Sequence, residues 1–277
     1  MTFDVLLFKA TLLVYSVATL LYLVGVITRR EQLGHCAKWT LVGGFATHCI
    51  ALGARWAATG FPPAASLYEA LSFFSWALVG TYLLFDLRYR IAALGAFVCP
   101  LALVMMIGGS AASKQKITVN PILDSWWFPV HVTLAFLGYA VFAVAAMAGV
   151  MYLLQERRVK AKKFSGLFFR LPPLDVLDSI NYKCLSFGFP LMTMGIISGA
   201  IWANSAWGGY WRWEPKETGA LVTWFLYAAL LHGRLTVGWR GRRAAIFAII
   251  GFVCLLFTFL GVNLLSGGQH TFRSFGE

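Results

Sequence analysis

A short aromatic stretch is the most informative feature of the sequence. Four of the eleven tryptophans fall between residues 202 and 213, and residues 207 to 213 include Trp207, Tyr210, Trp211 and Trp213. Tryptophans that anchor a membrane protein at its interfaces are spread over many helix ends. Anchoring at the membrane interface explains a single tryptophan better than it explains this cluster. Flat, rigid side chains set next to each other by Gly208 and Gly209 suit a large planar ligand.

A helix start follows the aromatic stretch. Pro215 fits the first helical position, and Glu217 falls at the third, where a carboxylate interacts favourably with the helix dipole. Part of this segment is therefore expected to act as a helix cap, and Glu217 is a candidate structural residue. Arg212 and Lys216 remain to neutralise acidic groups on a bound ligand.

The five histidines divide by position. His131 opens an apolar segment just after Trp126-Trp-Phe-Pro129, and His270 follows the last apolar segment. Imidazole is a standard axial ligand of haem iron, and haem is a flat, largely apolar disc with two propionates. The expected site has axial His131 and His270, an aromatic shelf and nearby cations. A hydrogen-bonding surface role is the alternative for each histidine taken alone.

His232 lies inside an apolar segment. An ionisable side chain within a membrane is a functional candidate by default, and a buried hydrogen bond between helices is the alternative. For His48 the structural role, a buried hydrogen bond between helices, is favoured. His35 is expected to be solvated.

The amino-acid composition limits the classes of protein to which the chain can belong. The chain has 277 residues, of which 59% are hydrophobic and 12% are charged, against about 25% charged residues in a typical globular protein. A soluble fold of this size could not cover its surface, and the mean hydropathy is +0.72. These values exclude a secreted disulfide scaffold, a disordered chain and a soluble nucleotide enzyme.

The predicted fold class is an all-α polytopic membrane protein. A spanning helix needs about 20 mainly apolar residues. About eight segments meet that requirement: residues 4–28, 37–57, 67–85, 91–109, 129–154, 184–204, 218–237 and 243–265. The first lacks the basic start and cleavage site of a signal peptide and is interpreted as a retained helix.

The distribution of Lys and Arg predicts the orientation. Sixteen of the 23 lie in four connecting segments, at residues 28–38, 86–90, 155–183 and 234–243. By the positive-inside rule these segments are cytoplasmic, so both termini face the outer side. The net charge of +12 therefore reflects topology and contact with membrane lipids, and nucleic acid is not an expected partner.

The organisation predicted for residues 1–277 is a single membrane domain. Residues 205–217 form its outward Trp-rich loop. Residues 155–183 form a basic, amphipathic linker on the cytoplasmic side, where Leu174, Leu177 and Ile180 have helical spacing.

The Trp-rich run resembles the signature of haem-handling proteins of cytochrome c biogenesis. It reads Trp207-Gly-Gly-Tyr-Trp-Arg-Trp-Glu-Pro-Lys-Glu-Thr-Gly-Ala-Leu-Val-Thr-Trp224 and is most similar to the CcsA (ResC) branch of the System II pathway. The likeness extends to Arg55-Trp56 with residues 60–69, Trp127 with His131, residues 171–199, Tyr227 with His232, and residues 263–270. One departure is Glu214, where family members usually have Asp, the better N-cap residue.

The resemblance implies a function and a set of residues. With a CcsB (ResB) partner, such a chain moves haem outward and attaches it to Cys-x-x-Cys-His of apocytochrome c. Its activity is then that of a cytochrome c haem lyase within a complex, with haem b as substrate. His131 and His270 match the external iron ligands, and His232 matches a transmembrane one. The matching loop residues are Trp207, Tyr210, Trp211, Arg212, Trp213, Glu214 and Lys216.

The setting and the catalytic chemistry also follow from this resemblance. The expected location is the bacterial inner membrane, or the thylakoid membrane in a plastid or cyanobacterium. Thiol-reducing proteins are indirect partners. No side chain is a convincing general acid or base, and none is assigned.

Three other functions fit parts of the sequence. Haem delivery without attachment, as in System I proteins that share the Trp-rich loop, uses the same residues. An ion or small-solute transporter would use the tryptophans as anchors and His232 as a proton relay. A purely structural subunit is the weakest alternative, because it leaves His and acidic groups near the membrane without use.

Overall fold

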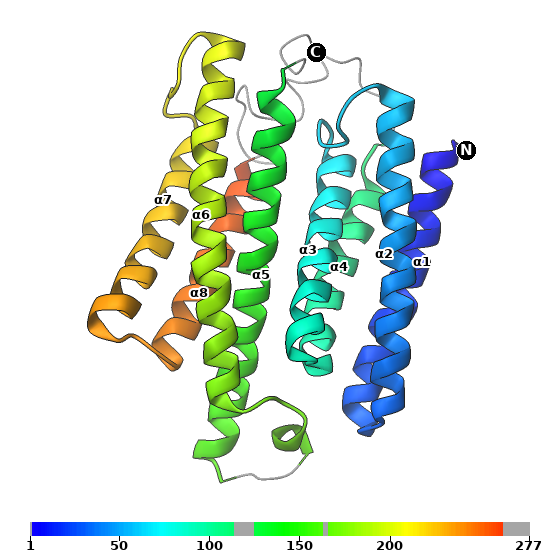
Figure 1. Cartoon of the computed structure of the whole chain (residues 1–277), viewed down its shortest axis with the longest axis vertical. Helices are drawn as coiled ribbons and strands as arrows, with labels where there is room; N and C mark the ends of the chain where they lie inside the picture. The colour runs from blue at the N-terminus through cyan, green and yellow to red at the C-terminus, as the bar shows by residue number, and fades with distance from the viewer. Residues whose placement is uncertain (1, 114–124, 163–165, 263–277) are drawn as a thin grey trace. The chain divides into compact units, whose positions relative to one another are not determined.

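The computed structural model describes residues 2–113, 125–162 and 166–262, and these residues form helices joined by short connections (Figure 1). The long α-helices are α1 (Phe3–Thr28), α2 (Glu31–Thr59), α3 (Leu67–Tyr89), α4 (Ala92–Ala111), α5 (Trp127–Lys160), α6 (Leu174–Trp207), α7 (Pro215–His232) and α8 (Arg242–Leu256). Three short elements are the 3-10 helix η2 (Gly166–Phe169) and the π-helical turns η3 (Gly233–Val237) and η4 (Phe257–Gly261).

Among the described residues, seven of these helices are long and apolar enough to cross a membrane, when α7 is continued by η3 and α8 by η4. The all-α polytopic membrane fold is thereby confirmed, and the chain is an integral membrane protein. The long helix outside this set is α2, which carries Lys38, His48 and Arg55 along its length. The orientation of the termini stays a prediction.

Several helices continue beyond the apolar segments that the sequence marks. Helices α5 and α6 each contain 34 residues. Residues 174–183, expected within the cytoplasmic-side linker, are the first turns of α6, and Leu177 and Ile180 are buried there. The helical spacing of these leucine and isoleucine residues therefore arises because they belong to a long helix. Hydrophobicity marks where a membrane begins, whereas backbone hydrogen bonding continues past it.

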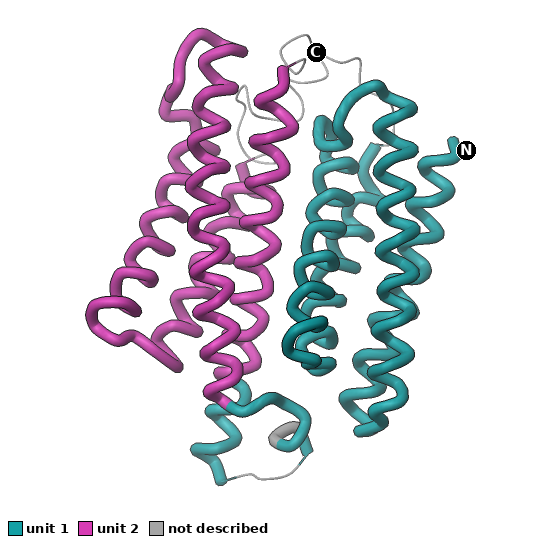
Figure 2. Tube along the Cα trace, in the orientation of Figure 1, with its two compact units in different colours: residues 1–116, 154–173 teal, residues 117–153, 174–277 magenta. Residues whose placement is uncertain are grey.

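The described helices group into two compact units, drawn in different colours in Figure 2. Unit 1 comprises Met1–Lys116 and Leu154–Pro173, and unit 2 comprises Ile117–Leu153 and Leu174–Glu277. Within unit 1, α1 packs on α2 and α4, and α3 packs on α4. Within unit 2, α7 packs on α6 and α8.

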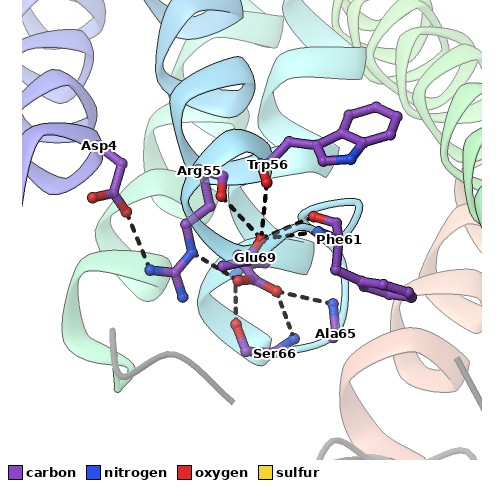
Figure 3. Close-up of polar contacts among 8 residues, drawn as sticks. Asp4, Arg55, Trp56, Phe61, Ala65, Ser66 and Glu69 are labelled. Carbon is purple, nitrogen blue, oxygen red and sulfur yellow. Dashed lines mark hydrogen bonds and ion pairs between the residues drawn. The ribbon is translucent and has the colours of Figure 1, made fainter. Parts of the chain in front are cut away.

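Unit 1 contains a buried cluster of charged groups that pair with one another. Arg55 is 3% exposed, and its Nε donates to Glu69 Oε1 at 2.8 Å while an Nη donates to Asp4 Oδ2 at 3.1 Å (Figure 3). The other oxygen of Glu69 accepts the backbone N–H groups of Ala65 and Ser66. Arg55 is paired with two carboxylates because a charged group buried without a partner is very costly. The cluster joins α1, α2 and the start of α3.

His48 belongs to a second buried group in unit 1. Its Nδ1 lies 3.2 Å from the Tyr15 hydroxyl and its Nε2 lies 3.0 Å from Ser72 Oγ. The ring joins α1, α2 and α3 through hydrogen bonds, which is the structural role favoured from the sequence.

Candidate functional site

The Trp-rich loop connects α6 to α7 in unit 2. Its non-helical part covers residues 208–214, because Trp207 is the last residue of α6 and Pro215 is the first of α7. Pro215 thus occupies the first helical position, as predicted. Glu214 is the N-cap residue, so the departure from the family's Asp lies at the position that begins the helix.

Glu217 organises the loop. Its Oε2 accepts the backbone N–H of Arg212 at 2.8 Å and that of Glu214 at 3.2 Å. These two residues flank Trp213, whose φ of 60° is a left-handed conformation that bulky residues rarely adopt. One carboxylate therefore holds Trp213 in a strained backbone geometry, and such strain is concentrated at functional sites. The predicted structural role of Glu217 is consistent with this arrangement.

The aromatic residues of the loop differ in exposure. Tyr210 is 60% exposed and Trp213 is 69% exposed, whereas Trp207 and Trp211 are half-buried. The rings of Trp211 and Trp213 meet edge to face with centroids 5.8 Å apart. The buried Nε1 of Trp211 has no hydrogen-bond partner among the described residues. The loop thus presents open flat surfaces beside one unsatisfied donor.

Arg212 and Lys216 occupy different places. The guanidinium of Arg212 donates to the carbonyl of Trp207, at the C-terminus of α6, so it also closes the loop. Lys216 lies in the first turn of α7. Their predicted role toward a ligand stays a prediction.

His131 is positioned by α6. Its Nδ1 lies 2.8 Å from the carbonyl oxygen of Gly195, and because a carbonyl only accepts, Nδ1 carries the proton. Nε2 is then the nitrogen with the lone pair in a neutral ring. The close approach requires glycine at 199, where a Cβ would lie 2.7 Å from the imidazole Nδ1.

Trp202 connects His131 to the loop. The imidazole is stacked on the indole of Trp202 with centroids 6.1 Å apart and an interplanar angle of 18°. Trp202 in turn meets Trp207 edge to face at 4.9 Å. Trp202 is 1% exposed. Trp202 belongs to the aromatic cluster of the sequence but is not among the predicted site residues. Its place five residues before Trp207 is the signal that could have identified it.

His232 lies at the other end of α7. It lies 17 positions after Pro215 in the sequence, which corresponds to about 26 Å of α-helix. Its side chain is exposed in unit 2. The structure therefore places His232 at the end of α7 opposite the Trp-rich loop. His270 lies outside the described residues, so its predicted pairing with His131 stays a prediction.

The turn after His232 is fixed to α6 by Asp178. Arg234 donates to Asp178 Oδ2 at 2.6 Å and to Oδ1 at 3.0 Å, and the backbone N–H of Gly241 donates to Oδ1 at 2.7 Å. The guanidinium also lies over the ring of Tyr182. Asp178 was missed from the sequence, where it was one more acidic residue of a polar segment.

The family of the chain follows from comparisons with known proteins. Residues 64–270 match the family described as Cytochrome C assembly protein, which defines the class of this membrane protein. A CcsA cytochrome c biogenesis protein of Guillardia theta is 33% identical, with 98% of this chain and 97% of the relative covered. A CcsA protein of Synechococcus elongatus is 36% identical, with 82% of this chain and 84% of the relative covered. The chain belongs to the CcsA family of cytochrome c biogenesis proteins.

A solved structure shares the fold. The cytochrome c haem lyase CcmF superposes with a TM-score of 0.68 at 18% sequence identity. The likeness covers 94% of this chain and 47% of CcmF, so this chain spans about half the length of that protein. At this identity the likeness establishes the fold alone.

The role of Glu217 gives a testable prediction for the loop. In Glu217→Ala, the amides of Arg212 and Glu214 lose their shared acceptor, and we expect them to exchange hydrogen about tenfold faster, corresponding to a lost cap of about 1–2 kcal/mol. Hydrogen-exchange mass spectrometry on a peptide spanning residues 208–214 measures this change. Glu217→Gln is the control, because it keeps a side-chain oxygen. Equal protection in Glu217→Ala and the wild type would contradict the assignment.

Proposed function

We propose that this chain binds haem b as a substrate at the end of unit 2 that carries His131 and the Trp-rich loop. With a CcsB-type partner it presents the haem for covalent attachment to apocytochrome c. The observation that carries the proposal is the fixed imidazole of His131, held by Gly195 and connected through Trp202 to the aromatic loop.

The chemistry of His131 suits iron binding. Histidines that ligate metals usually donate their second ring N–H to a backbone carbonyl or carboxylate, which fixes the tautomer and raises the basicity of the ligating nitrogen. The bond from Nδ1 to Gly195 has that form, and Nε2 is the ligating atom that we propose. His270 is the proposed ligand of the iron on the opposite face of the porphyrin ring.

The loop supplies the remaining contacts of the proposed site. The exposed rings of Tyr210 and Trp213 provide apolar surface for a porphyrin, and Trp211 Nε1 is a hydrogen-bond donor in need of an acceptor. Arg212 and Lys216 are the cations proposed for the propionates, since charge-assisted bonds to carboxylates are strong. Glu214 and Glu217 set the shape of this surface by starting α7.

His232 is the proposed ligand of a second, inner haem position. Its exposure on α7 leaves the imidazole open to a neighbouring molecule, which suits a site whose other ligand comes from the partner chain. Haem would pass this position before it reaches the outer site. His232 ends α7 about 26 Å of helix from Pro215, next to the Trp-rich loop, and the proposal therefore has two haem positions.

Attachment needs positioning more than acid–base catalysis. Each cysteine thiol of Cys-x-x-Cys-His adds across one vinyl group: the sulfur bonds to one carbon and the thiol hydrogen goes to the other, so no electrons are gained or lost. Holding the vinyl edge and the thiols in a fixed geometry supplies much of the rate enhancement. The incoming histidine would then replace one protein ligand and release the product. The proposed activity is that of a haem lyase acting within a complex.

The proposed location is the inner membrane of a bacterium or a thylakoid membrane. The curated CcsA relatives include a cyanobacterial protein. Thiol-reducing proteins would act indirectly, by keeping the cysteines of apocytochrome c reduced.

Reconstitution tests the function directly. The chain is co-expressed with a CcsB-type partner and an apocytochrome c in a host without its own maturation system. We expect haem that stays bound to the cytochrome on a denaturing gel. Haem bound to the chain without any covalent product would identify a delivery protein, and no haem at all would favour a transporter.

Replacing the proposed outer ligand tests the site. In His131→Ala we expect outer haem affinity to fall at least about tenfold, and added imidazole to restore the absorption spectrum by filling the vacant axial position. His35→Ala, which removes an exposed histidine of unit 1, is the control. An unchanged haem spectrum together with normal cytochrome c maturation in His131→Ala would show that the axial assignment is wrong.

Replacing His232 tests the inner position. We expect His232→Ala to lower total haem per protein while the haem that remains keeps its outer-site spectrum. The pyridine haemochrome assay measures haem content, and the absorption spectrum of the native protein shows whether the remaining haem keeps its ligands. Unaltered haem content would show that His232 has a packing role.

A further inference from the structure

Unit 1 contains a large cavity that the proposed function does not use. Its volume is about 890 Å³. Its lining comes from the last turns of α1 and α3, the first turns of α2 and α4, and the end of η2 with the residue that follows it. This is the end of the unit predicted to face the cytoplasm. Because the cavity shares no residue with the proposed haem positions, its role can be tested separately.

The lining is strongly basic. It contains the cationic residues Arg29, Arg30, Lys38, Arg90 and Arg170, and the acidic residues Glu31 and Asp86. Lys38 Nζ lies 2.7 Å from Asp86 Oδ2, so that pair is neutralised. Four arginines then face one glutamate. In the described part of this lining no other ion pair is formed, and the cavity keeps a net positive charge.

Arg170 has an incomplete set of hydrogen bonds among the described residues. Its Nε is buried and has no hydrogen-bond partner among the described residues. Leaving a charged donor buried and unsatisfied is costly. The segment that carries it is held in place by Arg29, which donates to the carbonyl of Gly166 at 3.3 Å and lies over the ring of Phe169 at 5.6 Å. Arg29 and Arg170 thus converge on the cavity from two chain segments.

Apart from the polar residues Gln32 and His35, the rest of the lining is apolar or aromatic. Tyr22, Gly25 and Val26 come from α1, and Ala92 and Ala93 come from the start of α4. Trp39 is 59% exposed, and its indole Nε1 donates to His35 Nε2 at 3.0 Å. An exposed tryptophan of this kind is typical of the headgroup level of a membrane. The ligand should therefore combine an anionic group with an apolar body.

We propose that this cavity binds an anionic phospholipid of the inner leaflet, with its phosphate against Arg29 and Arg170. Basic pockets between membrane helices on the cytoplasmic side bind phosphate headgroups. Arginine suits this purpose because its planar group donates two parallel hydrogen bonds to a phosphate. A lipid without an amine is favoured, since four arginines repel the ammonium group of a zwitterionic headgroup.

Lipid retention tests the proposal. The full chain is reconstituted in nanodiscs of phosphatidylcholine, alone or mixed with phosphatidylglycerol, and the lipids that stay bound after release are identified by native mass spectrometry. We expect one phosphatidylglycerol to be retained. Each arginine at a membrane surface contributes about fivefold to such binding, so the double variant Arg29→Gln/Arg170→Gln should retain it about 25-fold less strongly. Arg88→Gln is the matched control, because Arg88 is an exposed arginine of α3 outside the lining.

A second measurement uses the wild-type chain alone and does not depend on the folding of a variant. Phosphatidylglycerol should raise its thermal unfolding temperature relative to phosphatidylcholine, and inorganic phosphate in phosphatidylcholine nanodiscs should not. Equal retention of both lipids, or an equal loss in Arg88→Gln, would overturn the proposal. Stabilisation by inorganic phosphate without retained phosphatidylglycerol would also overturn it, because the occupant would then be a soluble phosphate.

Discussion

A polar side chain buried among apolar helices has no water to bind, so its partners have to come from the protein. This constraint shapes unit 1. Arg55 is enclosed by the carboxylates of Asp4 and Glu69, and His48 by the hydroxyls of Tyr15 and Ser72. Helix α2 provides both Arg55 and His48, and the pairing explains how a helix with this many polar residues packs among apolar neighbours.

The same constraint prepares the proposed site in unit 2. His131 satisfies its ring N–H with the carbonyl of Gly195, and this bond selects the tautomer that a metal requires. Glu217 satisfies two backbone N–H groups at the start of α7 and thereby holds the backbone of Trp213 in its left-handed conformation. Groups that stabilise the fold and groups proposed to bind haem are thus adjacent, and in His131 they are two nitrogens of one ring.

Some of this arrangement could be predicted from the sequence. The Pro215 position, the cap role of Glu217 and the membrane helices follow from local rules on propensity, dipoles and hydrophobicity. The contacts of His131 with Gly195 and Trp202 could not be predicted, because they depend on how α5 packs against α6. Asp178 was missed for the same reason: its partners Arg234 and Gly241 lie 56 and 63 residues away in the sequence. The starts and ends of α5 and α6 differ from the predicted spans because charged residues continue a helix beyond the apolar stretch.

Helix α7 carries Glu214 as its N-cap residue and His232 as its last residue, with an unbroken run of α-helix between them. An α-helix has a fixed rise and a fixed rotation for each residue, so the number of residues in α7 sets the distance and direction from Glu214 to His232. Adding or removing one residue would shift His232 by about 1.5 Å and rotate it by about 100° around the axis. Variation in length among relatives should therefore be confined to the connections, while this helix keeps a constant number of residues.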